Sequence, residues 1–237
     1  MFIQPDWPAP KRVQAISTTR QGGVSRAPFE SLNLGMHVGD SEKDVLANRQ
    51  QLPRSEQIIW LNQVHGNAVH RLNVGSEQNV SADASIALDT GITCAVMTAD
   101  CLPVLFCHRQ GLAVGAAHAG WRGLAAGVLE NTLAALPGQP EDYLVWLGPA
   151  IGPNAFEVGE DVKQAFAADY DAFKSTDKSG KFLADIYQLA RACLARAGVN
   201  EIYGGEYCTH QQACRFFSYR RDGQTGRMAS LIWLEDH

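Results

Sequence analysis

The sequence lacks long apolar segments, an excess of basic residues and low-complexity tracts. No run of about 18 apolar residues occurs, so we expect no membrane-spanning helix. The formal charge is -5 over 237 residues, which argues against a dedicated nucleic-acid binder, because such proteins usually present a basic face. Residues 1–12 lack the basic start and apolar core of a signal peptide, and we therefore expect a cytoplasmic protein.

Compact metal-binding motifs are also missing. The chain contains no C-x-x-C, no H-E-x-x-H and no His-x-His pair among its seven histidines. Because the copper ions that reduce dioxygen are bound mainly by histidines, multicopper chemistry is an improbable function for this chain. Its six cysteines occur in a chain much longer than a disulfide-rich secreted domain, so we expect reduced thiols.

The chain does contain an ordinary share of hydrophobic residues, 46%, which is enough for one continuous core. Short apolar runs between turn residues predict strands at 58–61, 68–72, 93–97, 103–107, 113–117, 143–147, 201–207 and 231–234. Helical spacing predicts helices at 124–136, 158–173 and 186–197. Because strands and helices do not alternate regularly, we expect an α+β fold. It would form a single domain over residues 1–237, with a mixed sheet and outer helices.

The clearest predicted helix spans residues 186–197. Asp185 can cap its first turn, and Gly198 suits its C-terminal end. Cys193 falls on the apolar face of this helix, so we predict that its thiol has a packing role.

Three segments at predicted strand ends contain reactive side chains. Segments 62–66, 98–103 and 118–123 contain His65, Cys101 and His118. Loops held by rigid strand ends often bear catalytic groups. One thiolate and two imidazoles suit zinc, and three protein ligands would leave a fourth position for water or substrate. The same ligand types occur at copper sites, so copper stays an alternative metal.

The same residues also fit a metal-free cysteine hydrolase. Cys101 would attack a carbonyl, His118 would act as its base, and Asp100 or Gln63 would orient the pair. His65 separates the two hypotheses, because a nucleophile–base pair does not require a second imidazole. A non-catalytic zinc module would normally supply four protein ligands rather than three.

Nine segments of the chain resemble the laccase-domain family of bacterial proteins. Members of this family were first described as polyphenol oxidases and later as purine nucleoside phosphorylases. The matching segments follow the family order along nearly the whole chain: 17–25, 31–35, 62–66, 98–103, 118–123, 147–152, 156–159, 216–222 and 225–227. Residues 83–87 depart from the pattern, reading Asp-Ala-Ser-Ile-Ala where the family more often has Asp-Ala-Leu-Val-Thr.

The resemblance implies a four-layer α/β/β/α sandwich with mixed sheets. It also implies that His65, Cys101 and His118 bind one zinc ion. The implied activity is zinc-dependent phosphorolysis of adenosine, inosine, guanosine and methylthioadenosine, accompanied by deamination of adenosine. Purine nucleosides and phosphate would then be the partners of this enzyme. A copper-dependent polyphenol oxidase is the second alternative, after the cysteine hydrolase.

The implied reactions need further groups. Deamination requires a carboxylate that moves protons, and Asp100 and Glu157 are the candidates in matched segments. Phosphorolysis requires an anion site, and four arginines could clamp phosphate with forked hydrogen bonds: Arg20, Arg49, Arg122 and Arg220. Asn33 is a further candidate for contact with the ligand.

A second cluster of metal-binding residue types occurs near the C-terminus. It contains Cys208, His210 and Cys214. Cys208 and the threonine after it match the family pattern, whereas His210 and Cys214 do not. We therefore predict a structural role for this cluster.

Overall fold

The strands form three sheets in the computed structural model, which describes residues 2–236. The five-stranded sheet has the order β1 (Phe2–Ile3), β2 (Val13–Thr18), β14 (Met228–Leu234), β6 (Thr93–Thr98) and β3 (Ile58–Ile59). The six-stranded sheet has the order β13 (Glu201–Gly204), β9 (Tyr143–Leu147), β7 (Leu102–His108), β8 (Val114–Ala119), β5 (Ala84–Ala87) and β4 (Val69–Leu72). The small sheet contains β10 (Glu157–Gly159), β12 (Lys181–Ala184) and β11 (Phe173–Ser175). Both large sheets mix parallel and antiparallel pairs.

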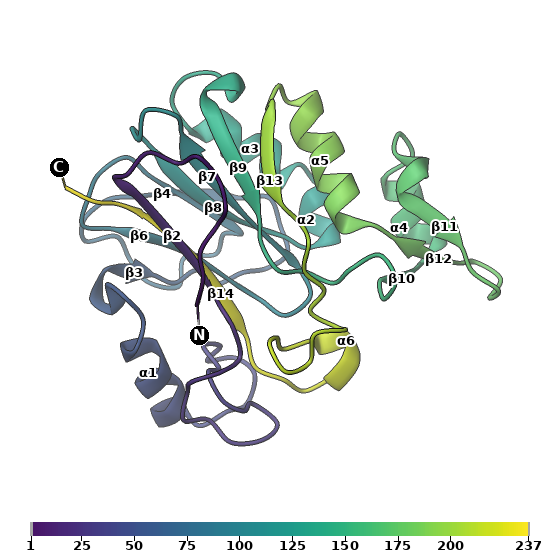
Figure 1. Ribbon diagram of the computed structural model, residues 1–237, viewed down its shortest axis with the longest axis horizontal. Helices are drawn as coiled ribbons and strands as arrows, with labels where there is room; N and C mark the ends of the chain where they lie inside the picture. Colours follow the sequence, from purple (N-terminus) through teal and green to yellow (C-terminus); the bar gives the residue numbers. More distant parts are fainter. Residues whose placement is uncertain (1, 237) are drawn as a thin grey trace.

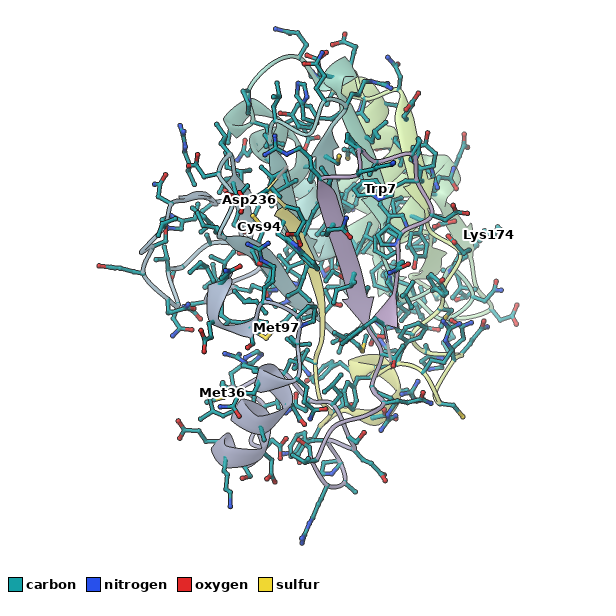
Figure 2. The ribbon with its side chains drawn as sticks, turned by 60° about the vertical axis from the view of Figure 1, so that its left-hand side comes forward. Trp7, Met36, Cys94, Met97, Lys174 and Asp236 are labelled. Atoms are coloured by element: carbon teal, nitrogen blue, oxygen red, sulfur yellow. The ribbon has the colours of Figure 1, made fainter. Side chains whose placement is uncertain are left out.

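The two large sheets pack face to face and are covered on their outer sides. Alternate residues of one strand belong to different layers: Cys94 lies in the core between the sheets, and Met97 lies in the core outside the five-stranded sheet. This alternation follows from the two-residue repeat of side chains along a strand. In Figure 2, Met97 lies between the strands and α1 (Glu42–Gln50), where its sulfur is 3.8 Å from Arg49 Nη2.

Helices cover the outer face of the six-stranded sheet. α3 (Val128–Ala135) and α5 (Ile186–Arg196) pack on the side of β7 that bears Phe106, and both lie beside this sheet in Figure 1. Segment 32–52, which includes α1, packs on the outer face of the five-stranded sheet; α1 is labelled in Figure 1. The layer order is therefore helices, sheet, sheet and a segment with one helix. The expected α+β fold with mixed sheets and outer helices is confirmed.

The remaining helices are short. They are α2 (Trp121–Ala125), α4 (Glu160–Ala165) and α6 (Tyr219–Asp222), with 3-10 turns at Ser55–Gln57, Pro140–Asp142 and Tyr170–Ala172. Within residues 2–236, every helix is too short or too polar to cross a membrane.

The predicted helices had different outcomes. The helix predicted at 186–197 is confirmed as α5, and the Asp185 carboxylate accepts hydrogen bonds from the first-turn N–H groups of Tyr187 and Gln188. The helix predicted at 124–136 is interrupted by Gly127, whose φ is 86°, so that α2 and α3 are separate.

The helix predicted at 158–173 is wrong over most of its length. Only the six residues of α4 are α-helical, and they are flanked by β10 and β11. Val158 is opposite Phe182 of β12, and the Phe166 and Phe173 rings pack with centroids 6.4 Å apart. Apolar residues that follow the spacing of a helical face therefore lie partly in strands that pair with β12. The sequence pattern did not indicate β12.

The chain passes directly between the two large sheets at two places that matter for the site. It leaves β3 of the five-stranded sheet and enters β4 of the six-stranded sheet, and it later passes from β6 to β7 in the same way. His65 lies in the first crossover and Cys101 in the second, while His118 lies near the end of β8.

Candidate metal centre and its cavities

The three predicted metal-binding side chains converge. Potential ligand atoms of His65, Cys101 and His118 all lie within 4.8 Å of one another. Cys101 Sγ is 3.9 Å from His65 Nε2, and the two imidazole rings meet edge to face with centroids 4.8 Å apart. His65 is exposed, Cys101 is partly buried and His118 is buried, so the cluster opens to solvent on one side. Within residues 2–236 no other group of three such residues could hold a metal ion.

A buried carboxylate orients both histidines. Asp83 has no exposed surface, and its oxygens accept hydrogen bonds from the backbone N–H groups of Val64, His65 and Gly66. His118 Nδ1 lies 2.8 Å from Asp83 Oδ1. A proton on Nδ1 leaves Nε2 free to bind a metal or accept a proton, which is how carboxylates commonly orient metal-binding histidines.

The carboxylate also holds the first crossover in an unusual backbone conformation. His65 has φ 60°, which a residue with a side chain seldom adopts. The three N–H bonds to Asp83 supply the interactions that hold residues 64–66 there.

Charge interactions within the cluster favour a Cys101 thiolate beside a protonated His118. Burial opposes ionisation of Cys101, but the imidazoles of His118 and His65 outweigh it and lower the thiol pKa to about 6. Burial likewise disfavours the charged form of His118, yet Cys101 and Asp83 raise its pKa to about 9. Near neutral pH, Cys101 is therefore a thiolate, the form that binds metals and attacks electrophiles.

Two glycines allow the ligands to approach one another. A Cβ atom on Gly120 would lie 3.0 Å from Cys101 Sγ and 3.2 Å from a carbon of the His65 ring. A Cβ atom on Gly123 would lie only 2.6 Å from the backbone oxygen of Gly66. Segment 118–123 therefore packs closely against both other ligand segments because it lacks these two side chains.

Asp100 fixes the Cys101 loop to the C-terminal part of the chain. Its carboxylate accepts hydrogen bonds from the hydroxyls of Thr209 and Ser218 and from the backbone N–H of Arg220. Ser218 also caps α6. These bonds place α6 and its aromatic first residue, Tyr219, beside the metal cluster.

Two cavities flank the cluster and share four lining residues: His65, Ala99, Cys101 and Tyr219. The first cavity, of about 250 Å³, has mostly apolar and aromatic walls completed by Asp100, Trp121, Arg122, Ile151, Phe156, Ile186 and Arg220. The second cavity, of about 330 Å³, is completed by His37, Gln63, Met97, Thr98, His118 and Arg227.

The four arginines predicted to bind substrate fall into two groups. Arg122 and Arg220 line the first cavity. Arg122 stacks on Trp121 with its guanidinium 4.3 Å from the ring centroid. Arg20 instead donates to the backbone oxygens of Glu30 and Ala213.

Arg49 is held by contacts with other parts of the fold. It stacks on Trp60 at 4.0 Å and donates to the backbone oxygen of Leu34. Arg20 and Arg49 line neither cavity beside the cluster. Their hydrogen bonds connect segments of the fold.

Two other predicted residues have partners within the protein. The Glu157 carboxylate forms an ion pair with Lys178 at 2.9 Å, and this residue lines neither cavity. The buried Asn33 amide accepts hydrogen bonds from the backbone N–H groups of Gly35 and Arg227 and donates to Asp40. Asn33 therefore acts on the second cavity through the position of Arg227.

Gln63 does not have the role that the cysteine hydrolase hypothesis gave it. Gln63, proposed to orient the Cys101–His118 pair, is bonded through its amide to the backbone N–H and C=O of Met97. The group that contacts His118 is Asp83.

Sequence reasoning missed three residues of this site: Asp83, Tyr219 and Arg227. Tyr219 and Arg227 lie within segments that match the resemblance pattern, whereas Asp83 begins the segment 83–87 that departs from it. The signal that could have indicated Asp83 is a charged residue directly before a run of small and apolar residues, Ala84–Ala87, because a buried carboxylate needs several hydrogen-bond donors.

Comparison with known protein families agrees with the resemblance. A family model described as "Multi-copper polyphenol oxidoreductase laccase" matches residues 14–235. The chain is 55% identical over 239 residues to purine nucleoside phosphorylase YfiH of Escherichia coli strain K12, covering 98% of each chain. It is 52% identical over 241 residues to a purine nucleoside phosphorylase of Pseudomonas aeruginosa, covering 99% of each.

Solved structures share the whole fold. A crystal structure of a Neisseria meningitidis protein of family DUF152 superposes with a TM-score of 0.96 at 52% identity, covering 99% of both chains. YlmD from Geobacillus stearothermophilus superposes with a TM-score of 0.94 at 32% identity, covering 99% of this chain and 96% of the other.

Proposed function

This chain belongs to the family described as multi-copper polyphenol oxidoreductase laccase, and on that premise we propose that it is a zinc-dependent purine nucleoside phosphorylase. Adenosine, inosine, guanosine and methylthioadenosine are the proposed nucleosides, and phosphate is the second substrate. The names of the relatives at 52% and 55% identity support this proposal. The observation that carries it is the open cluster of His65, Cys101 and His118 between two cavities.

The donor set fits zinc. A thiolate and two imidazoles are the ligand types that zinc prefers, and three protein ligands are typical of catalytic rather than structural sites. Asp83 fixes both histidine segments, and the missing side chain of Gly120 leaves room beside Cys101 and His65. A bound zinc ion would supply Lewis acidity at this position.

Aromatic residues of the first cavity suit a purine base. Trp121, Phe156 and Tyr219 line this cavity, and rings of this kind stack on planar bases. Arg122 and Arg220 are proposed to hold polar groups of the substrate from the same walls, since guanidinium groups both stack and form forked hydrogen bonds.

Phosphorolysis transfers the ribosyl group from the purine to phosphate. An oxygen of hydrogenphosphate forms a bond to C1′ while the C1′–N9 bond breaks, and the bonding electron pair leaves with the purine. The proton of hydrogenphosphate ends on the released base, so ribose 1-phosphate and free purine account for all atoms. The chain must align the two substrates and exclude water, because water would produce free ribose instead.

Adenosine deamination is a second proposed reaction of the same site. Water replaces the C6 amino group, giving inosine and ammonia, and protons must move to the leaving nitrogen. Asp100 lines the first cavity, although its carboxylate already accepts three hydrogen bonds. Glu157 is paired with Lys178. The assignment of either carboxylate to proton transfer stays a prediction.

The test combines metal content with turnover. Wild type and His65→Ala are purified without added metal and assayed for zinc and for phosphate-dependent release of base from adenosine or inosine. We expect wild type to retain about one zinc per chain and to lose activity after chelation. His65→Ala should lose zinc and activity together. Full activity of chelated wild type would refute the zinc mechanism.

A metal-free cysteine hydrolase is the second candidate, favoured by one specific observation. Cys101, His118 and Asp83 form a nucleophile, base and orienting carboxylate, with the thiol pKa lowered to about 6. This is the arrangement that activates cysteine nucleophiles. Here His65→Ala would weaken substrate binding at most, and activity would survive chelation but not Cys101→Ala.

Copper-dependent oxidation of polyphenols receives less support. The ligand types also suit copper, but residues 2–236 contain only one three-residue cluster. Reduction of dioxygen by several copper ions would need more clusters than these residues supply.

A further inference from the structure

One wall of the second cavity contains an arginine and a histidine that the proposed reaction has not yet used. His37 and Arg227 lie there with the three metal-binding residues. Its ten lining residues include no aspartate or glutamate. An adjoining groove shares His37, Tyr219 and Arg227 with this cavity, and its lining also lacks acidic residues.

Arg227 is held in this wall by the surrounding backbone. Asn33 accepts the Arg227 N–H, and Nη1 of the guanidinium donates to the backbone oxygens of Thr225 and Gly226. A Cβ atom on Gly35 would lie 2.8 Å from Arg227 Cγ, so this glycine makes room for the arginine stem. Within residues 2–236, the hydrogen bonds of the Arg227 guanidinium are made by Nη1, which leaves the Nε and Nη2 donors available to a ligand.

Two further features indicate an anion. Burial, and then the nearby guanidinium of Arg227, lower the pKa of His37, so that its neutral imidazole can donate one hydrogen bond to an anion beside Arg227. Thr225 lines the adjoining groove. Its hydroxyl is buried without a hydrogen-bond partner among the described residues, an arrangement that is rare without a ligand or water.

We propose that inorganic phosphate binds in the second cavity against Arg227 and His37, while the nucleoside occupies the first cavity. This inference rests on the proposed phosphorylase function and assigns its two substrates to separate subsites. Guanidinium forms forked hydrogen bonds to phosphate oxygens, and the two cavities meet at His65, Ala99, Cys101 and Tyr219. Phosphate and nucleoside would therefore approach from different sides of the metal cluster.

The arrangement explains the transfer step without a further reactant. The phosphate oxygen attacks C1′ from the side of the second cavity, and the purine leaves into the first with the electron pair of the C1′–N9 bond. The proton of hydrogenphosphate ends on the purine, as in the overall reaction.

The competing assignment places phosphate on Arg122 and Arg220. Both residues line the first cavity beside Trp121 and Phe156. Those aromatic walls suit a base better than a dianion, because desolvating a charge against apolar surface is costly. Variants of the two walls therefore separate the two assignments.

The experiment measures binding of inorganic phosphate to the purified metal-loaded protein by calorimetric titration, with and without a free purine base, which has no ribosyl group to transfer to phosphate. The variants are Arg227→Gln, Arg122→Gln and Thr225→Val, and Arg71→Gln is the control. Arg71 is exposed on β4 and lines neither cavity, so its variant has the same charge change elsewhere. Thr225→Val removes a hydroxyl that has no hydrogen-bond partner within residues 2–236, so the fold should tolerate it.

We expect Arg227→Gln to raise the phosphate Kd by about tenfold or more, as loss of a charge-assisted hydrogen bond predicts. Thr225→Val should raise it by a smaller factor, and Arg71→Gln should leave it unchanged. In turnover assays Arg227→Gln should raise KM for phosphate while KM for inosine stays within about twofold.

Three results would overturn the assignment. They are equal phosphate binding by wild type and Arg227→Gln, loss of phosphate binding in Arg122→Gln instead, or absence of phosphate binding by folded wild type under both conditions. Because binding is measured without turnover, this inference can fail while phosphorolysis stands. Conversely, a wild type that binds phosphate at Arg227 but releases no base would refute the proposed function alone.

Discussion

Asp83 accepts backbone hydrogen bonds from residues 64–66 and contacts His118. Replacing it with asparagine preserves size but places a neutral amide opposite the Nδ1 proton of His118. We expect Asp83→Asn to weaken zinc binding by about 10–100-fold, the usual effect of losing a group that orients a ligand. Competition with a chromogenic chelator measures this affinity directly.

A purely structural role for Asp83 would give a different pattern. In that case the melting temperature would fall while the zinc affinity of the folded fraction stayed at the wild-type value. Asp83→Glu, which keeps the charge, serves as the comparison and should retain more zinc affinity than Asp83→Asn.

Cys193 and Cys101 should contribute differently to stability and activity. Cys193 is buried on α5, and burial raises the pKa of its thiol to about 11, so it is protonated near neutral pH. We expect Cys193→Ala to cost roughly 1 kcal/mol of folding stability and to leave turnover nearly intact. Cys101→Ala should abolish metal retention and activity together. Assays of both folded variants for zinc and base release test this, and equal losses would contradict it.

The sequence allowed the three candidate ligands to be predicted, but not the residues that hold them. Cys101 and His118 lie at or near strand ends and His65 in a short crossover between strands, so local sequence patterns were enough to indicate them. Asp83 bonds to a loop almost twenty residues earlier in the chain. A periodic pattern of apolar residues cannot indicate such a contact. Arg227 likewise depends on Asn33, far away in sequence.

Helix α2 packs closely against the loop that contains His65. The backbone of α2 at Gly123 contacts the backbone of the His65 loop, and an added Cβ would lie 2.6 Å from Gly66 O. Because neither backbone can rotate away, Gly123→Ala should displace the loop, lower zinc affinity and reduce the melting temperature by several degrees, the shift expected for roughly 1–3 kcal/mol of overpacking.

The control is Ala125→Ser, an exposed position on the same helix. Its zinc affinity and melting temperature should match wild type. Unchanged zinc affinity in Gly123→Ala would show that the loop accommodates the methyl group and that this contact does not position His65.

Elements were predictable where local signals agreed with one another. Helix α5 has a capping aspartate and an apolar face that packs on the sheet. Segment 158–173 shows the opposite case, because Val158 and Phe173 follow helical spacing yet pair with β12. Pairing with a strand that comes later in the chain overrides a local preference, as is common for strands.

At the scale of the whole molecule, the layer order depends on pairings between distant parts of the chain. β14 pairs with both β2 and β6, so that Ser230 is opposite Ser17 and Val96. The local sequence of each strand does not indicate which distant strand it pairs with. The pattern of strands therefore indicated only a mixed sheet. The order of four layers came from the resemblance to a family.

The ligands also connect the sheets, which leads to a prediction for the complete fold. His65 and Cys101 lie in two of the crossovers between the large sheets, and His118 lies on β8 of the six-stranded sheet. A metal bound by all three residues ties these segments together, and unfolding must separate them. Zinc should therefore stabilise the folded chain, by about 4 kcal/mol when free zinc is a thousandfold above its Kd.

We expect wild-type protein to melt several degrees higher with zinc than after chelation, since about 1 kcal/mol corresponds to roughly 2–4 °C in a chain of this length. His65→Ala should lose most of this increment while melting close to chelated wild type in the absence of metal, because His65 is exposed. Thermal unfolding of both proteins with zinc and with chelator measures the difference. An equal zinc-dependent increment in both proteins would mean that the ion binds without His65. The crossovers would then not be linked through a common metal.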